Sequence, residues 1–164
     1  MTQRGHPESE LRRKLLTGSA SAALLAPLLG TGLLIPGRVL AADWNRNAFT
    51  AHSADEALKA WGSGNAAASR DIVIVAPEIA ENGAKVEVEA TCNVPNVRSM
   101  AVLAEKNPMP LCATLEFTPP AVPYARIQIK LSETTRLRVV AKTTDGKSYV
   151  AFRDIKVTLG GCGG

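Results

Sequence analysis

Much of the chain shows a pattern of period two, which is typical of β-strands with one buried face. In the segment "AKVEVEATC", the apolar residues from Val86 to Cys92 share one face and the acidic residues between them take the other. A short, nearly continuous β-branched run lies at 71–77, and further strand-like runs occur at 99–105, 111–117 and 125–131, and twice within 135–159. The pattern therefore predicts about seven strands.

Turn signals separate these runs and indicate how the strands connect. Asp145 and Gly146 lie between the last two alternating runs and form a strong β-hairpin signal. Prolines fall between the runs, where no ladder N–H is needed. Seven short strands in about a hundred residues predict an all-β fold, an immunoglobulin-like antiparallel β-sandwich. A partly open β-barrel is the alternative, because alternation does not decide whether a sheet closes.

A short helix is predicted before the strands. In "SADEALKAWG", Ser53 is the expected N-cap and Glu56 follows three residues later, which is the spacing of a capping box. Leu58 and Trp61 share one helical face, and Gly62 can end the helix in the left-handed conformation. The glycine- and serine-rich segment that follows is expected to be a linker.

The first 41 residues have the pattern of an export signal. A charged start with two arginines at 12–14 precedes a weakly apolar stretch at 15–36, and the small residues of "RVLAAD" follow. The arginine pair resembles a twin-arginine signal. We expect residues 1–41 to be removed, so that the mature chain begins at Ala42 or Asp43 in the periplasm. An uncleaved membrane anchor is the alternative, although its proline and small polar residues would make a poor lipid-facing helix.

The net charge of +4 belongs largely to this signal. Residues 1–41 hold five of the 19 Lys and Arg residues and two of the 15 Asp and Glu residues, which leaves a net charge near +1. A nearly neutral domain gives no support for nucleic-acid binding, and no membrane contact is expected after cleavage. We expect three parts: the signal at 1–41, one β-sandwich domain at 42–159 and a flexible tail at 160–164.

Few residues beyond the signal suit catalysis. His52 is the single histidine after residue 41, no CxxC or HxxxH motif occurs, and no GxSxG motif supplies a nucleophile. No glycine-rich phosphate loop precedes a helix. We therefore expect no metal, no cofactor and no enzyme active site, and we interpret His52 as an exposed loop residue.

Cys92 and Cys112 raise the question of a disulfide. An exported protein can form one, and this pair would close a loop of about 20 residues, worth on the order of 3 kcal/mol in the chain-entropy model. Because alternate residues of a strand face opposite sides, Cys112 points away from the side that Leu115 and Phe117 share. This weakens the case for a Cys92–Cys112 disulfide. We predict the disulfide, and the alternative is two buried free thiols that act as small hydrophobic groups.

The chain ends in "GGCGG", with Cys162 between two pairs of glycines at 160–161 and 163–164. A prenylation box needs three residues after the cysteine, and here there are two. A structural disulfide on a glycine tether would lose the most entropy on closure.

From Leu159 to the end the tail can reach at most roughly 16–18 Å. No neighbouring group would lower the pKa of this thiol. The tail is therefore interpreted as a swinging arm, formed by Gly160, Gly161, Gly163 and Gly164, whose thiol is acted on by other proteins.

These features together resemble the SoxY family of sulfur carriers in thiosulfate oxidation. The resemblance lies in the twin-arginine signal, "APEIAENGA" before an alternating strand, "NPMPLCATLEF" and the terminal "GGCGG". It implies a periplasmic carrier that is not itself an enzyme. The resemblance also implies that Cys162 is the covalent attachment site for thiosulfate-derived sulfur, as a cysteine S-thiosulfonate.

The resemblance further implies a set of partners. Carriers of this family form a heterodimer with a second small β-sandwich, SoxZ. The c-type cytochrome SoxXA loads the cysteine oxidatively, the hydrolase SoxB releases sulfate, and a sulfur dehydrogenase, where present, oxidises the remaining sulfur. These transient partners would hold the active sites that the carrier lacks.

Two other functions fit parts of the sequence. An ubiquitin-like sulfur carrier would use the carboxylate of Gly164, but that chemistry needs ATP, from which an exported protein is separated. An exported immunoglobulin-like structural module would use Cys162 for an intermolecular disulfide. The position of the sulfur, on the Cys162 side chain or the Gly164 carboxylate, distinguishes the two carriers.

Overall fold

The computed structural model describes residues 44–159. The predicted signal and the predicted arm, with Cys162, lie outside these residues. Two short helices come first, α3 (Arg46–Thr50) and α4 (Ala54–Ala60). Nine strands follow in the described part: β1 (Ala67–Ala68), β2 (Ile72–Val75), β3 (Ile79–Asn82), β4 (Val86–Cys92), β5 (Val97–Ala104), β6 (Leu111–Glu116), β7 (Tyr124–Ile129), β8 (Thr135–Thr143) and β9 (Ser148–Leu159).

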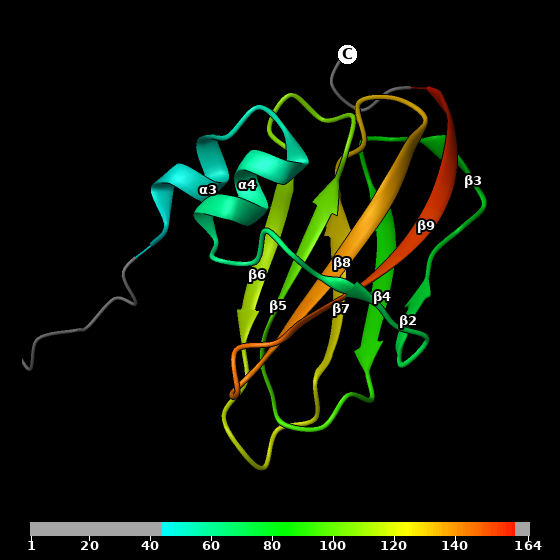
Figure 1. Cartoon of the computed structure of the whole chain (residues 1–164). Helices are drawn as coiled ribbons and strands as arrows, with labels where there is room; N and C mark the ends of the chain where they lie inside the picture. The colour runs from blue at the N-terminus through cyan, green and yellow to red at the C-terminus, as the bar shows by residue number, and fades with distance from the viewer. Residues whose placement is uncertain (1–43, 160–164) are drawn as a thin grey trace, which may run out of the picture. The chain divides into compact units, whose positions relative to one another are not determined.

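The strands form two packed sheets, which confirms the predicted sandwich over the barrel (Figure 1). One sheet has the order β1-β9-β8-β5-β6, with β3 also paired to β9, and the other has the order β2-β4-β7. The neighbours β5–β6, β5–β8, β8–β9, β2–β4 and β4–β7 are antiparallel. β1 and β3 run parallel to β9, one along its beginning and the other along its end.

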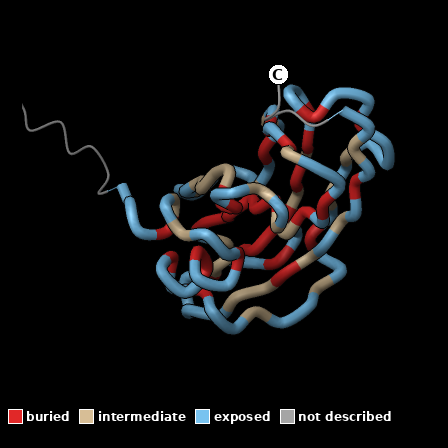
Figure 2. The backbone as a smooth tube through the Cα atoms, turned by 90° about the horizontal axis from the view of Figure 1, so that it is seen from above, coloured by how far each residue is buried: buried red, intermediate tan, exposed pale blue. Residues whose placement is uncertain are grey.

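The alternating residues point as predicted. Val86, Val88, Ala90 and Cys92 on β4 are buried between the sheets, and the acidic residues between them face outward. Two clusters of buried side chains fill the sandwich, one around Met100 and one around Leu137. Figure 2 shows these buried residues running through the middle of the domain, with exposed residues at its outer turns.

The helices cover part of the outer face of the larger sheet. A third cluster joins Leu58 and Trp61 of the helical segment to Leu103, Val140 and Val150 of the sheet. The hydroxyl oxygen of Ser53 accepts a hydrogen bond of 3.2 Å from the N–H of Glu56, as the predicted cap requires. β5 is therefore buried on both faces from Ser99 to Ala104.

Three elements were missed by the sequence pattern. The helix α3 precedes the predicted one, with Asn45 as its N-cap. β1 lies in the expected linker, and β3 lies in a segment interpreted as a turn. Both strands are short and mostly exposed, and they form by parallel pairing with β9, which no local alternation reveals.

The predicted hairpin is present between β8 and β9. Gly146 has a positive φ of 83°, a conformation that glycine adopts without steric cost. Within residues 44–159, no helix has the length and apolar character that would let it cross a membrane.

Candidate functional site at the base of the tail

The predicted site residue Cys162 lies outside the described residues, but the strand that leads to it is well placed. β9 pairs with β8 over most of its length, from Ser148 to Ile155, and its end pairs with β3. Leu159, the last described residue, lies opposite Asn82. The carbonyl of Leu159 accepts a hydrogen bond of 2.7 Å from the N–H of Gly83. The tail therefore starts from a point fixed by the sheet and by the β3–β4 turn.

Further hydrogen bonds connect this turn to two loops at the same end of the sandwich. The N–H of Leu131 donates to the carbonyl of Gly83 at 2.7 Å, which ties the β7–β8 loop to the turn. Asn107, in the β5–β6 loop, donates from Nδ2 to the carbonyl of Lys130 at 2.8 Å and accepts from the N–H of Ser132 at 3.0 Å. We call Gly83, Asn107, Leu131, Ser132 and Leu159 the tail base. The sequence analysis missed Asn107, although the neighbouring prolines marked its loop.

Cys92 and Cys112 are free thiols in the structure, so the predicted disulfide is wrong. Cys92 packs in the cluster around Met100, whereas Cys112 packs against the cluster around Leu137. The two residues lie on β4 and β6, which belong to different sheets. The alternative of two free thiols used as small hydrophobic groups is the one the structure supports.

Burial also makes both thiols poor nucleophiles. Desolvation raises the pKa of the Cys92 thiol, and it raises the pKa of Cys112 to about 11. The Cys112 sulfur lies 3.4 Å from the carbonyl oxygen of Pro110, to which it donates. Since the thiolate is the reactive form, neither group is suited to react at neutral pH.

His52 contacts the protein through its ring rather than facing a site. Its Nδ1 lies 3.2 Å from the carbonyl oxygen of Pro108, so it connects the turn between α3 and α4 to the β5–β6 loop. Over residues 44–159, no group of three or more His, Cys, Asp or Glu side chains could hold a metal ion. His52 is therefore best explained as a structural contact.

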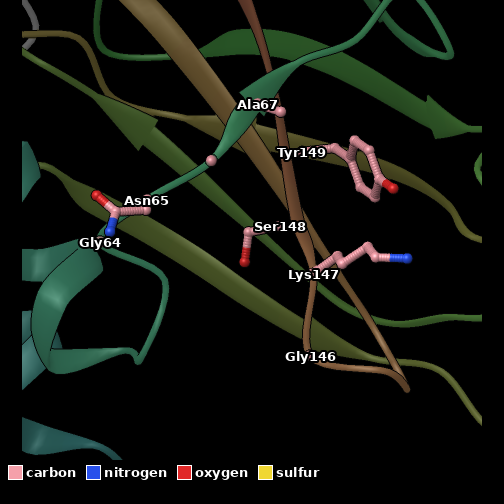
Figure 3. A pocket seen from close by; sticks show the side chains of 8 residues that line it. Gly64, Asn65, Ala67, Gly146, Lys147, Ser148 and Tyr149 are labelled. Carbon is pink, nitrogen blue, oxygen red and sulfur yellow. The ribbon is translucent and has the colours of Figure 1, made fainter.

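A wide pocket of about 610 Å³ lies near the start of β9, at the other end of that strand from Leu159 (Figure 3). β9 has 12 residues, so its two ends are about 36 Å apart. Two polar lining residues already have partners: Lys147 pairs with Asp145 at 2.8 Å, and Ser148 Oγ accepts from Ser63 Oγ at 2.6 Å. The lining residues of this pocket include no nucleophile with an adjacent base.

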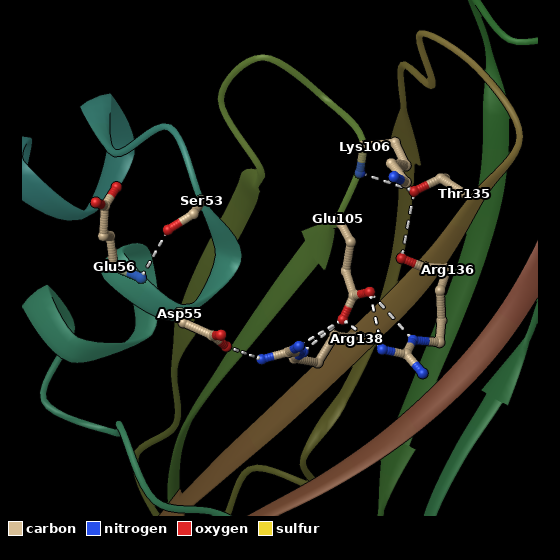
Figure 4. A network of polar contacts seen from close by, with 8 residues as sticks. All are labelled: Ser53, Asp55, Glu56, Glu105, Lys106, Thr135, Arg136 and Arg138. Carbon is tan, nitrogen blue, oxygen red and sulfur yellow. Dashed lines mark hydrogen bonds and ion pairs between the residues drawn. The ribbon is translucent and has the colours of Figure 1, made fainter.

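A charged network ties the helical segment to the larger sheet (Figure 4). Arg138 Nη2 lies 2.6 Å from Glu105, and Arg138 Nη1 lies 2.7 Å from Asp55 on α4. Arg136 also pairs with Glu105, at 3.0 Å. Both guanidinium groups lie over the ring of Phe152, at 4.6 and 5.4 Å from its centroid. The sequence analysis singled out neither arginine, because their partners come from segments far away in the chain.

The comparisons with known proteins decide the family. The sequence model of the family described as "Sulfur oxidation protein SoxY" matches residues 58–162, which includes Cys162. The chain belongs to the SoxY family. No curated protein matches it in sequence.

A solved SoxY structure has the same fold. The sulfur carrier protein SoxY from Chlorobium limicola f thiosulfatophilum is 34% identical, with a TM-score of 0.57, over 64% of this chain and 96% of that one. A superoxide reductase (neelaredoxin) from Ignicoccus hospitalis is 22% identical, with a TM-score of 0.48, over 54% of this chain and 80% of that one. The SoxY match thus confirms both the resemblance and the sandwich.

Proposed function

We propose that this SoxY-family protein carries thiosulfate-derived sulfur covalently on Cys162. The observation that carries the proposal is the family match, which extends from α4 to Cys162 itself. Cys92 is buried, Cys112 is half-buried, and both thiols have raised pKa values, so they would not compete for the sulfur. The tail base would hold the start of the arm in a fixed direction while the four glycines let the arm enter a partner's active site.

The proposed loading step is an oxidation. The Cys162 sulfur loses its proton and forms an S–S bond with the terminal sulfur of thiosulfate, and two electrons leave to a c-type cytochrome. The product is a cysteine S-thiosulfonate. Water then attacks the terminal sulfonate sulfur, sulfate leaves with that oxygen, and a persulfide remains on Cys162. Both steps need a partner, because the described residues of this chain supply no oxidant and no hydrolytic site.

The proposed setting is the periplasm, after export by the twin-arginine route. The carrier would form a heterodimer with a SoxZ-like subunit and act in turn with SoxXA, SoxB and, where it exists, a sulfur dehydrogenase. Covalent attachment suits this chemistry, because thiosulfate and its oxidation products are small anions that otherwise diffuse away between enzymes.

The deciding experiment is the intact mass of mature protein from thiosulfate-grown cells, before and after mild reduction, with mapping of the tail peptide. Reducible sulfur adducts on Cys162 would support the carrier. Sulfur on the Gly164 carboxylate would support the thiocarboxylate carrier instead. A Cys162–Cys162 dimer that does not respond to thiosulfate would favour the structural module.

A further inference from the structure

The edge of the larger sheet is interrupted along the middle of β9. β1 pairs with β9 at Tyr149 and Val150, and β3 pairs with it again only from Lys156. Between these contacts the chain leaves the edge, crosses to the smaller sheet as β2, and returns as β3 (Figure 1). Residues 151–155 of β9 therefore have a neighbouring strand on one side only, β8, and the centre of this stretch is Phe152–Asp154. We call this centre the β9 notch.

Two of the three notch residues, Phe152 and Asp154, direct their backbone groups away from β8. The carbonyl of Val150 accepts from Ser69 and the N–H of Lys156 donates to Glu78, both on the side of β1 and β3. Alternate residues of a strand direct their N–H and C=O groups to the same side. Phe152 and Asp154 alternate with the same period as Val150 and Lys156, so their backbone groups point to the same side. Within residues 44–159, neither has a backbone partner there. An unpaired edge of this kind is a template for an added strand.

The surface on both sides of the notch is hollowed. One groove of about 470 Å³ is lined by Ile79, Phe152, Arg153 and Lys156, among others. Another, of about 450 Å³, lies towards β1 and also reaches Phe152. Ile79 and Phe152 are 58% and 45% exposed, which is high for large apolar side chains. An extended segment thus has space beside the edge and apolar surface to cover.

The charges around the notch favour an acidic segment. Arg153 is only partly satisfied: its Nη2 donates to the carbonyl of Ala76 at 3.3 Å and lies 3.6 Å from the exposed Glu78, while its buried Nε has no partner in the described residues. Arg70 and Lys156 add two more cations to the groove walls, which makes three with Arg153, and the opposing charges there are the two carboxylates of Glu78 and Asp154. A carboxylate on the added strand would complete the hydrogen bonding of the Arg153 guanidinium.

We propose that the β9 notch binds an extended acidic segment of a partner protein by strand addition. About three residues of the segment would pair with Phe152 and Asp154. A central acidic side chain would face Arg153, on the inner side of β9, and apolar residues on either side of it would cover Phe152 and Ile79. The proposal does not depend on the chemistry of Cys162, since it concerns only the edge of the described sheet.

The test is a titration of the full-length, ¹⁵N-labelled chain with two capped synthetic peptides, Ac-TVEVT-amide and Ac-TVQVT-amide. The acidic peptide should shift the amide signals of Phe152 and Asp154 and slow their hydrogen exchange. The glutamine peptide should bind at least about fivefold more weakly, as expected for the loss of a charged hydrogen bond. Absence of saturable binding, or shifts centred elsewhere, would overturn the proposal.

A pair of variants at one position isolates the backbone contact. Asp154→Pro removes the outward N–H without breaking a bond to β8, whereas Asp154→Ala keeps that N–H. The first should weaken peptide binding by about fivefold or more relative to the second. Equal binding by the two would contradict strand addition. If Asp154→Pro does not fold, Arg153→Gln takes its place and should remove the preference for the acidic peptide.

Two controls exclude other occupants of the notch. Protection of Phe152 and Asp154 that rises with protein concentration, without peptide, would show a second copy in the notch. A change in these two signals on deletion of residues 160–164 would show that the chain's own tail occupies it. Either result would overturn the proposed partner segment.

Discussion

The N–H of Gly83 donates a hydrogen bond of 2.7 Å to the carbonyl of Leu159, so the β3–β4 turn holds the last described residue of β9. Gly83 in turn accepts from Leu131, whose neighbour Ser132 is held by Asn107. The point where the tail begins is thus connected to the β5–β6 loop by a continuous series of hydrogen bonds. A change at Asn107 should therefore be felt at Leu159.

Asn107→Ala should destabilise the protein by about 1–3 kcal/mol, because it leaves the carbonyl of Lys130 and the N–H of Ser132 without their partners. Urea denaturation measures this loss. Hydrogen exchange should also become faster at the amides of Leu131 and Gly83. Asn107→Asp is the matched control, since it keeps an oxygen that accepts from Ser132. Unchanged exchange at Gly83 in Asn107→Ala would show that the tail base does not behave as one unit.

Cys162→Ser should abolish sulfur loading and leave the thermal melting temperature within about 2 °C of the parent, because residue 162 lies beyond the last strand of the sandwich. Mass spectrometry after incubation with thiosulfate and the loading enzyme measures the first effect, and calorimetry measures the second. Cys112→Ala is the control and should still be loaded. A large drop in melting temperature for Cys162→Ser would contradict the model of a free arm.

The Cys112 thiol should resist alkylation at pH 8 and react faster as the pH approaches 11, since burial raises its pKa to about 11. Iodoacetamide labelling of the Cys162→Ser variant, followed by peptide mapping, measures the rate at each pH. Labelling of Cys112 in the folded protein at pH 8 as fast as in the urea-unfolded protein would contradict a raised pKa for this thiol.

The same shift predicts a loss of stability at high pH. The unfolded thiol ionises near pH 9, before the folded one, so the unfolded state binds fewer protons between pH 9 and pH 11 and stability falls over that range. The loss from this group should reach roughly 2–3 kcal/mol by pH 11. Cys112→Ala should lose less stability than the parent protein over the same range. An identical decline in the variant and the parent would contradict the role given to the Cys112 thiol.

Glu105→Gln should destabilise the protein more than Asp55→Asn, although both remove an ion pair with Arg138. The Glu105 side chain is 18% exposed, whereas that of Asp55 is 88% exposed and screened by water. We expect a loss of about 1–3 kcal/mol for the first variant and at most about 0.5 kcal/mol for the second. Urea denaturation measures the free energy of unfolding of both variants. Equal losses would show that burial does not determine how much each ion pair contributes to stability.

Gly161→Val combined with Gly163→Val should slow sulfur transfer to the partner enzymes without lowering the stability of the sandwich. Bulky, β-branched residues restrict the backbone and would obstruct entry of the arm into a narrow active site. Turnover with purified partners and thermal melting measure the two effects. Normal turnover would remove the case for glycine as a means of threading the arm.

The fold could be predicted where the chain alternates strictly. β4 is the clearest example, because residues 86–92 alternate between buried apolar and outward polar side chains along the whole strand. β3 could not be predicted in this way: only Ala80 is buried, Ile79 is exposed, and the strand forms because β9 lies beside it. Parallel pairing between segments about 75 residues apart leaves no local signal.

The site could be predicted only in part. The glycine tail and the family features in the sequence led to Cys162 as the predicted attachment site, and the family match extends to that residue. The disulfide prediction failed because Cys92 and Cys112 pack against different core clusters, and this separation is a property of the whole fold that the sequence pattern does not contain. Asn107 is similar: its role depends on Lys130 and Ser132 lying next to it, which the sequence does not reveal.

The arrangement of β9 has a consequence for how the protein is made. Among the described strands, β9 is synthesised last, yet it pairs with β8 and with two strands formed much earlier, β1 and β3. The edge that these early strands need is missing until the ribosome has completed β9, so the larger sheet closes at a late stage and over a long sequence separation. A chain interrupted before Leu159 would lack both this closure and the residues that follow it. If residues 160–164 act as the proposed arm, its synthesis therefore comes only after the last strand of the sheet, so a nascent or truncated chain could not offer the arm on a finished domain.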